Sequence, residues 1–156
     1  MKKIIAGIVA CIIMASNVCA FATEDQYAES TLTYTADDQF YISVPETINV
    51  GGESTVTATG VNIAPNKILR VYVNNFESDS TIPLINVNDS QYKAYAEFYT
   101  ASGERVDTSG NSIVQFQSGD SGLSKEFNTR LSSNSSDVAG EYTGAVQFRI
   151  TCEESY

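Results

Sequence analysis

The stretch near the end of the chain alternates between apolar and polar side chains, and this alternation constrains the fold more than any other feature of the sequence. The residues that would share one face are Tyr142, Gly144, Val146, Phe148, Ile150 and Cys152. Because the side chains of a β-strand point alternately to opposite faces, this pattern predicts one long strand with a buried face. After Thr23 no window carries the apolar stripe of an amphipathic helix, so little or no helix is expected.

Shorter segments of the same kind precede this one, separated by clusters of Gly, Asn, Asp and Ser that favour turns. They cover residues 40–44, 48–50, 56–63, 69–73, 82–87, 92–98, 113–117 and 123–131. With no helix to cross over between parallel strands, the strands would pair antiparallel. We therefore predict an all-β fold, an antiparallel two-sheet Ig-like β-sandwich with Greek-key connections and seven to nine strands. A closed barrel is the alternative.

Three local features refine this prediction. The apolar parity changes after Gly60, which is typical of a β-bulge. The segment Ala64-Pro65-Asn66-Lys67 has proline at the second position of a type I turn, so residues 54–74 are expected to form a hairpin. Pro83 lacks a backbone donor, and the strand at 82–87 is therefore expected at a sheet edge.

The first 22 residues have the three parts of a bacterial signal peptide. These are the basic Lys2 and Lys3, the apolar run 4–15, and Ala20-Phe21-Ala22 before the cleavage point. Lipidation at Cys11 is an alternative, whereas the apolar run is short for a transmembrane anchor. We predict a signal peptide at 1–22, an acidic N-terminal lead or edge strand at 23–38, and a β-sandwich domain at 39–156.

Charge limits the partners. The chain has nine basic and 19 acidic residues, and loss of two lysines with the signal peptide leaves seven against 19, a net charge of −12. Such a polyanion lacks the basic patches that nucleic acid and anionic membranes require. We expect a secreted, extracellular protein, with cell-surface association open. Neither nucleic acid as a partner nor membrane insertion after signal cleavage is expected.

Catalytic chemistry is restricted by the absence of histidine, which excludes Ser-His-Asp and Cys-His catalysis. Gly119-Asp120-Ser121-Gly122 matches part of the nucleophile signature of trypsin-like proteases, and Asp107-Thr108-Ser109-Gly110 is near the aspartic-protease pattern. The first has no general base and the second has an inserted serine, so both are interpreted as turns. The acidic pairs Asp37-Asp38 and Glu153-Glu154 would point to opposite faces of a strand rather than converge on a sugar. We expect no enzyme, no catalytic residue, no metal site and no cofactor.

The chain contains nine tyrosines, and some of them fall on the polar side of their strands. Tyr72, Tyr95 and Tyr99 are the candidates for a binding face, because exposed aromatic rings stack on sugars or anchor protein partners. Aromatic pairs that only stabilise a sheet are the alternative interpretation.

Three residues near the C-terminus are expected to have structural roles. Gly140 and Tyr142 have the spacing of a tyrosine corner, in which the tyrosine hydroxyl bonds to the backbone a few residues upstream. Cys152 is the one cysteine left after signal cleavage, so no intramolecular disulfide is possible. Its parity predicts a buried structural thiol, with an intermolecular disulfide as the alternative.

Three segments resemble the secreted Ig-like β-sandwich surface proteins of Gram-positive bacteria. The tail from Val138 to Ile150 carries the pattern Gly-x-Tyr-x-Gly-x-x-x-Phe-x-Ile that is similar to their final strand. Ile42-Ser43-Val44-Pro45-Glu46-Thr47-Ile48 resembles their opening strand, and Thr57-Ala58-Thr59-Gly60 resembles their second hairpin. The resemblance implies a β-sandwich of adhesin-like or matrix type, in a group mostly without known enzymatic activity. The chain lacks the Leu-Pro-x-Thr-Gly sorting signal of anchored members.

These observations lead to one functional hypothesis and one alternative. The hypothesis is a non-catalytic secreted bacterial surface protein, adhesin-like or of matrix type, that acts by contact with an unknown protein or glycan at the cell surface. The alternative is a carbohydrate-binding module in which the three candidate tyrosines stack on sugar rings. An enzyme relying on carboxylates alone ranks third.

Overall fold

The computed structural model describes residue 31 and residues 33–155 of the 156-residue chain. Within this part there are ten β-strands and no helix. The strands are β1 (Gln39–Ser43), β2 (Glu53–Asn62), β3 (Lys67–Val73), β4 (Ile82–Asn86), β5 (Lys93–Thr100), β6 (Arg105–Val106), β7 (Val114–Gln117), β8 (Ser124–Leu131), β9 (Tyr142–Thr143) and β10 (Phe148–Glu154). The predicted signal peptide, and residues 23–30 and 32 of the predicted lead, lie outside the described residues.

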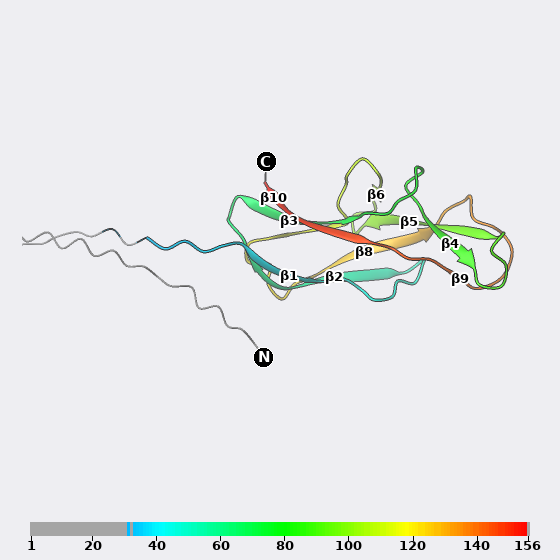
Figure 1. Ribbon diagram of the computed structural model, residues 1–156, viewed down its shortest axis with the longest axis horizontal. Coiled ribbons are helices and arrows are strands. Elements are labelled where there is room, and N and C mark those ends of the chain that lie inside the picture. Colours follow the sequence, from blue (N-terminus) through cyan, green and yellow to red (C-terminus); the bar gives the residue numbers. More distant parts are fainter. Residues whose placement is uncertain (1–30, 32, 156) are drawn as a thin grey trace, which may run out of the picture. The chain divides into compact units, whose positions relative to one another are not determined.

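The strands form two antiparallel sheets (Figure 1). The first sheet has seven strands in the order β1-β2-β8-β5-β4-β9, with β6 pairing beside β4 on the same edge of β5. The second sheet has three strands in the order β10-β3-β7. The predicted all-β, antiparallel fold is confirmed, whereas assignment to the Ig-like class stays a prediction. No helix within the described ranges has the length and hydropathy needed to cross a membrane.

The predicted number of seven to nine strands is too low by one. The structure adds β6 and β9, which are only two residues long, whereas the predicted segment 48–50 forms no strand. A strand of two residues shows no period-two pattern, so β6 was included in a predicted loop, and β9 in a longer predicted strand.

The core lies between the two sheets and is filled by their inward-facing rows. The largest fully buried side chains are Phe116, Phe127, Leu69, Val56, Val71 and Val106. The ring of Phe127 in the first sheet lies 6.1 Å from that of Phe98 and 6.2 Å from that of Phe148 in the second sheet. These aromatic contacts therefore connect the sheets across the core.

The predicted hairpin at 54–74 is wrong, although both of its local signals are present. Ala64 accepts the turn hydrogen bond from the N–H of Lys67 at 2.9 Å. Tyr41 pairs with Gly60 and Ile42 with Ala58, so Thr59 is the extra residue of a β-bulge in β2. However, β1 and β8 occupy the two edges of β2, and β3 pairs in the second sheet. The turn therefore connects the two sheets.

The long strand predicted from Tyr142 to Cys152 is also wrong, because the chain changes sheets within it. Tyr142 and Thr143 pair with β4 in the first sheet, whereas residues from Phe148 onward pair with β3 in the second. Between them lies Gly144, at which an added Cβ would lie 2.4 Å from the carbonyl oxygen of Pro83. The missing side chain lets the backbone pass β4 at close range before crossing to β10.

The chain enters the first sheet through a polar contact at Asp38. Its carboxylate accepts hydrogen bonds from the Nζ of Lys67 and, at 2.9 Å, from the N–H of Ala64. The ammonium group of Lys67 holds the pKa of Asp38 below its ordinary value, and the pKa of Lys67 is raised in return. Residues 31 and 33–38, the described part of the predicted lead, contain no strand. The division of the chain at residue 38 stays a prediction.

Candidate functional site

Tyr95 and Tyr99 lie on the outer face of the first sheet, opposite the buried Ala94, Ala96 and Phe98. The hydroxyl of Tyr99 donates a 2.6 Å hydrogen bond to Glu97, and this bond raises the pKa of Tyr99. One face of the Tyr99 ring is covered by the guanidinium of Arg130, 4.6 Å from the ring centroid. The ring therefore stacks within the protein.

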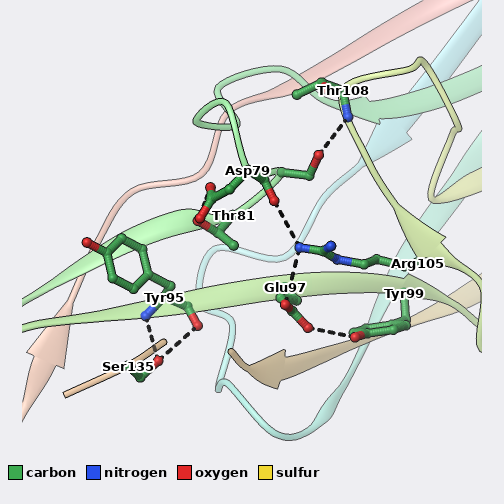
Figure 2. Close-up of polar contacts among 9 residues, drawn as sticks. Asp79, Thr81, Tyr95, Glu97, Tyr99, Arg105, Thr108 and Ser135 are labelled. Carbon is green, nitrogen blue, oxygen red and sulfur yellow. Dashed lines mark hydrogen bonds and ion pairs between the residues drawn. The ribbon is translucent and has the colours of Figure 1, made fainter. Parts of the chain in front are cut away.

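The same outer face carries a polar network that connects β5 and β6 to the loop before β4 (Figure 2). Glu97 pairs with Arg105 at 3.2 Å, and Arg105 also donates to the carbonyl oxygen of Asp79 at 3.0 Å. Ser80, which has a positive φ of 63°, accepts from the N–H of Thr108 at 3.1 Å. These contacts hold the loop in place, and they occupy the polar groups around Tyr99.

Tyr72 lies on the outer face of the second sheet and is only 7% exposed. The guanidinium of Arg149 covers its ring at 4.4 Å, and its hydroxyl donates to the carboxylate of Glu153 at 3.1 Å. The two sheets turn their outer faces in opposite directions. The structure therefore does not bring Tyr72 together with Tyr95 and Tyr99 on one face.

The two protease-like motifs form turns. Asp107 accepts hydrogen bonds from the N–H of Ser109, at 2.8 Å, and from its hydroxyl. Ser121 accepts from the N–H of Val61 at 2.7 Å, just beyond the β-bulge of β2. Asp120 pairs with Lys125 at 2.9 Å and accepts from the N–H of Gln117 at 3.0 Å. These side chains are engaged in local structure.

The turn at Asp120 predicts a pH-dependent contribution to stability. The hydrogen bond from Lys125 is the main cause of a pKa below the ordinary carboxyl value, and the bond from the backbone of Gln117 adds to it. A lowered pKa stabilises the fold above the unfolded value of about 4, and this gain is lost as the pH falls through the folded value. D120N should therefore reduce the free energy of unfolding at neutral pH by about 1 kcal/mol. The deficit should therefore be smaller at pH 3 than at pH 7.

Denaturant melts of wild type and variant at both pH values measure this difference. Glu126→Gln, at an exposed position of β8, is the control for loss of one negative charge. An equal deficit of D120N at the two pH values would show that the charge of Asp120 is not its source.

The hydroxyl of Tyr142 donates to the carbonyl oxygen of Val138, four residues upstream, at 2.7 Å. This is the contact that a tyrosine corner requires. Because the bond is solvent-exposed, we predict that Tyr142→Phe lowers the free energy of unfolding by about 1 kcal/mol. Tyr41→Phe, at a side chain that is 68% exposed, is the matched control. Equal denaturation midpoints for the two variants would remove the corner as a stabilising feature.

Gly140 precedes, and Cys152 follows, the segment in which the chain passes from the first sheet to the second. A Cβ at Gly140 would lie 2.3 Å from the Nδ2 of the buried Asn86, so a side chain here would displace that amide. Cys152 packs against the core beside Ile150 but is only half-buried, and it is a free thiol in the described part of the chain. Burial raises its pKa. The thiol is thus less buried than predicted, because β10 lies at a sheet edge.

A groove of about 1010 Å³ lies on the core side of the first sheet, and we call it the open groove. Its floor comes from β4, β5 and the end of β8, and its walls from residues 44–50, residues 136–146 and Phe148. Among the lining side chains, Leu131 is 56% exposed and Val138 is 41% exposed. Six further apolar side chains of the lining pack against the core but are only half-buried: Val44, Ile48, Val50, Leu84, Val146 and Phe148.

The walls of the open groove continue the edge strands of the two sheets. Residues 44–50 follow β1, which pairs only with β2, and residues 144–147 lead into β10, which pairs only with β3 among the described residues. Sequence reasoning missed this groove because strand edges depend on the pairing of distant segments. The one available signal was the pair Gly140 and Gly144, which both lie against β4.

The comparisons with known proteins are limited. No protein-family model and no curated protein matches the chain. Among solved structures it is similar to a chain described as "Chaperone-tip adhesin complex is vital for synergistic activation of CFA/I fimbriae biogenesis". That likeness has a TM-score of 0.44 and 16% identity, and it covers 75% of this chain and 42% of the other. The chain thus spans less than half of that protein, and the likeness carries no argument about function.

Proposed function

We propose that the protein is a secreted, non-catalytic surface protein of adhesin-like or matrix type, and that it acts by binding an extended segment of a protein partner in the open groove. The observation that carries this proposal is the row of half-buried apolar side chains in the open groove, between residues 44–50, which follow the edge strand β1, and residues 136–146, which precede the edge strand β10. An extended peptide that pairs with a free edge gains backbone hydrogen bonds, and alternate side chains fill the apolar floor.

The volume of the groove is large enough for part of a peptide, and the positions of the tyrosines weigh against the carbohydrate-binding alternative. The groove volume of about 1010 Å³ reaches the upper end of the range for small-molecule pockets, about 300–1,000 Å³. The carbohydrate-binding alternative depends on three tyrosines of which Tyr72 lies on one sheet and Tyr95 and Tyr99 on the other. The rings of Tyr72 and Tyr99 are, moreover, covered by arginines. This arrangement favours the protein partner.

Val146 and Gln147 provide a matched pair of variants for the test. Val146 lines the open groove and is half-buried, whereas the next residue, Gln147, is exposed. A fluorescein-labelled neutral peptide of alternating Val and Thr should bind the mature protein, with a rise in fluorescence anisotropy that saturates. Val146→Asn should weaken this binding about tenfold or more, whereas Gln147→Asn should leave it unchanged.

Two results would contradict the proposal. One is the absence of saturable peptide binding, or equal binding by the two variants after thermal melts have shown both to be folded. The other is hydrolysis of a peptide or polysaccharide by the pure protein. Specific binding on a glycan array that Tyr95→Ala abolishes would instead favour the carbohydrate-binding module.

A further inference from the structure

The lining of the open groove carries charge of one sign. Its three ionisable carboxyl side chains are Glu46, Asp137 and Glu141, and it contains no Lys or Arg. All three are exposed, and the four ion pairs among the described residues involve other carboxylates. The groove therefore presents an apolar floor inside an acidic rim.

We infer that the partner segment is a strand of a different protein, with alternating apolar side chains and with Lys or Arg at its ends. This inference rests on the proposed function, since it names the chemistry of the segment that the open groove binds. Opposite charges on paired strands are stabilising and like charges are destabilising. Complementary charges also increase the rate of association.

The charge of the chain itself argues against a second copy as the partner. The lead segment 23–38 would be the available strand, and it contains five carboxyl residues and no basic residue. These are Glu24, Asp25, Glu29, Asp37 and Asp38. Inserted into the groove of a neighbour, this segment would place negative charge beside the acidic rim.

Peptides that differ only in their end charges test the inference. All share one alternating Val/Thr centre, and their ends carry pairs of Lys, pairs of Glu or pairs of Ser; a fourth peptide has the sequence of residues 27–38. At low ionic strength the Lys-ended peptide should bind the mature protein about tenfold more tightly than the Glu-ended one. At about 0.5 M salt the difference should largely disappear, because screening weakens surface charge pairs.

A rim variant separates charge from groove binding. The combination of E46Q, D137N and E141Q should bind the Lys-ended and Glu-ended peptides equally, with an unchanged affinity for the Ser-ended peptide. Val146→Asn should weaken binding of all of them.

Three outcomes would overturn the inference while leaving the proposed function in place. They are equal binding of the Lys-ended and Glu-ended peptides, tighter binding of the peptide 27–38, and concentration-dependent oligomers of the mature protein that this peptide dissolves. If none of the peptides binds, the Ser-ended one included, the proposed function itself fails.

Discussion

Replacement of Phe127 by alanine is expected to lower the free energy of unfolding by about 4 kcal/mol. The side chain is fully buried, and its ring contacts Phe98 in its own sheet and Phe148 in the other sheet. Its removal takes away both the apolar burial and the aromatic contacts that connect the sheets, and it leaves a cavity that β-strands cannot easily collapse around.

Urea or guanidinium melts followed by far-ultraviolet circular dichroism measure this loss. Tyr41→Ala is the control, because that side chain is 68% exposed and its loss should change stability by less than about 0.5 kcal/mol. A loss below about 2 kcal/mol for the Phe127 variant would mean that the core is less tightly packed at this position than the structure shows.

Gly144→Ala is expected to destabilise the protein by about 3 kcal/mol. The added Cβ would lie 2.4 Å from the carbonyl oxygen of Pro83 and 2.8 Å from the Cδ2 of Leu84. A side-chain tip can rotate away, but the carbonyl belongs to β4, which pairs with β5 through residues 82–85. The backbone must therefore move, at the point where the chain leaves the first sheet.

The matched control is Ala145→Ser, a substitution of similar size at the next, exposed residue. It should change the midpoint of unfolding very little. A Gly144→Ala variant as stable as this control would contradict the close passage of the chain against β4.

Strands could be predicted from the sequence wherever buried and outward-facing side chains alternate along one continuous segment. In β5 the buried Ala94, Ala96 and Phe98 alternate with polar-side residues, and any sheet with one buried face imposes this pattern. The bulge beside Gly60 was predictable for the same reason, because the apolar residues change from one side of the strand to the other within a few neighbouring residues.

Strand pairing was less predictable, because it joins residues that are distant in the chain. The sequences of β2 and β3 have the pattern of a hairpin. However, β1 and β8 pair with the two edges of β2, so β3 cannot pair with it. The alternation of apolar and polar residues from Tyr142 to Cys152 is continuous in the sequence. The segment is nevertheless divided between the two sheets, and the division falls where Gly144 passes close to Pro83.

The surroundings of the tyrosines depend on register in the same way. Tyr72 pairs directly with Arg149, and this pairing places the guanidinium over the ring. Arg130 pairs with Glu97 and reaches the Tyr99 ring from the neighbouring strand. The predicted polar-side position of these tyrosines is correct, but period-two parity contains no information on which side chain lies across the next strand.

The position of β10 has a kinetic consequence. This strand supplies Phe148 to the aromatic contacts, and its Glu153 bonds to Tyr72, 81 residues earlier in the chain. The second sheet can therefore gain its edge strand only after a large loop has closed, and contacts of such sequence separation slow folding. Until β10 is in place, β3 lacks this neighbour in the second sheet, and the core between the sheets is incomplete.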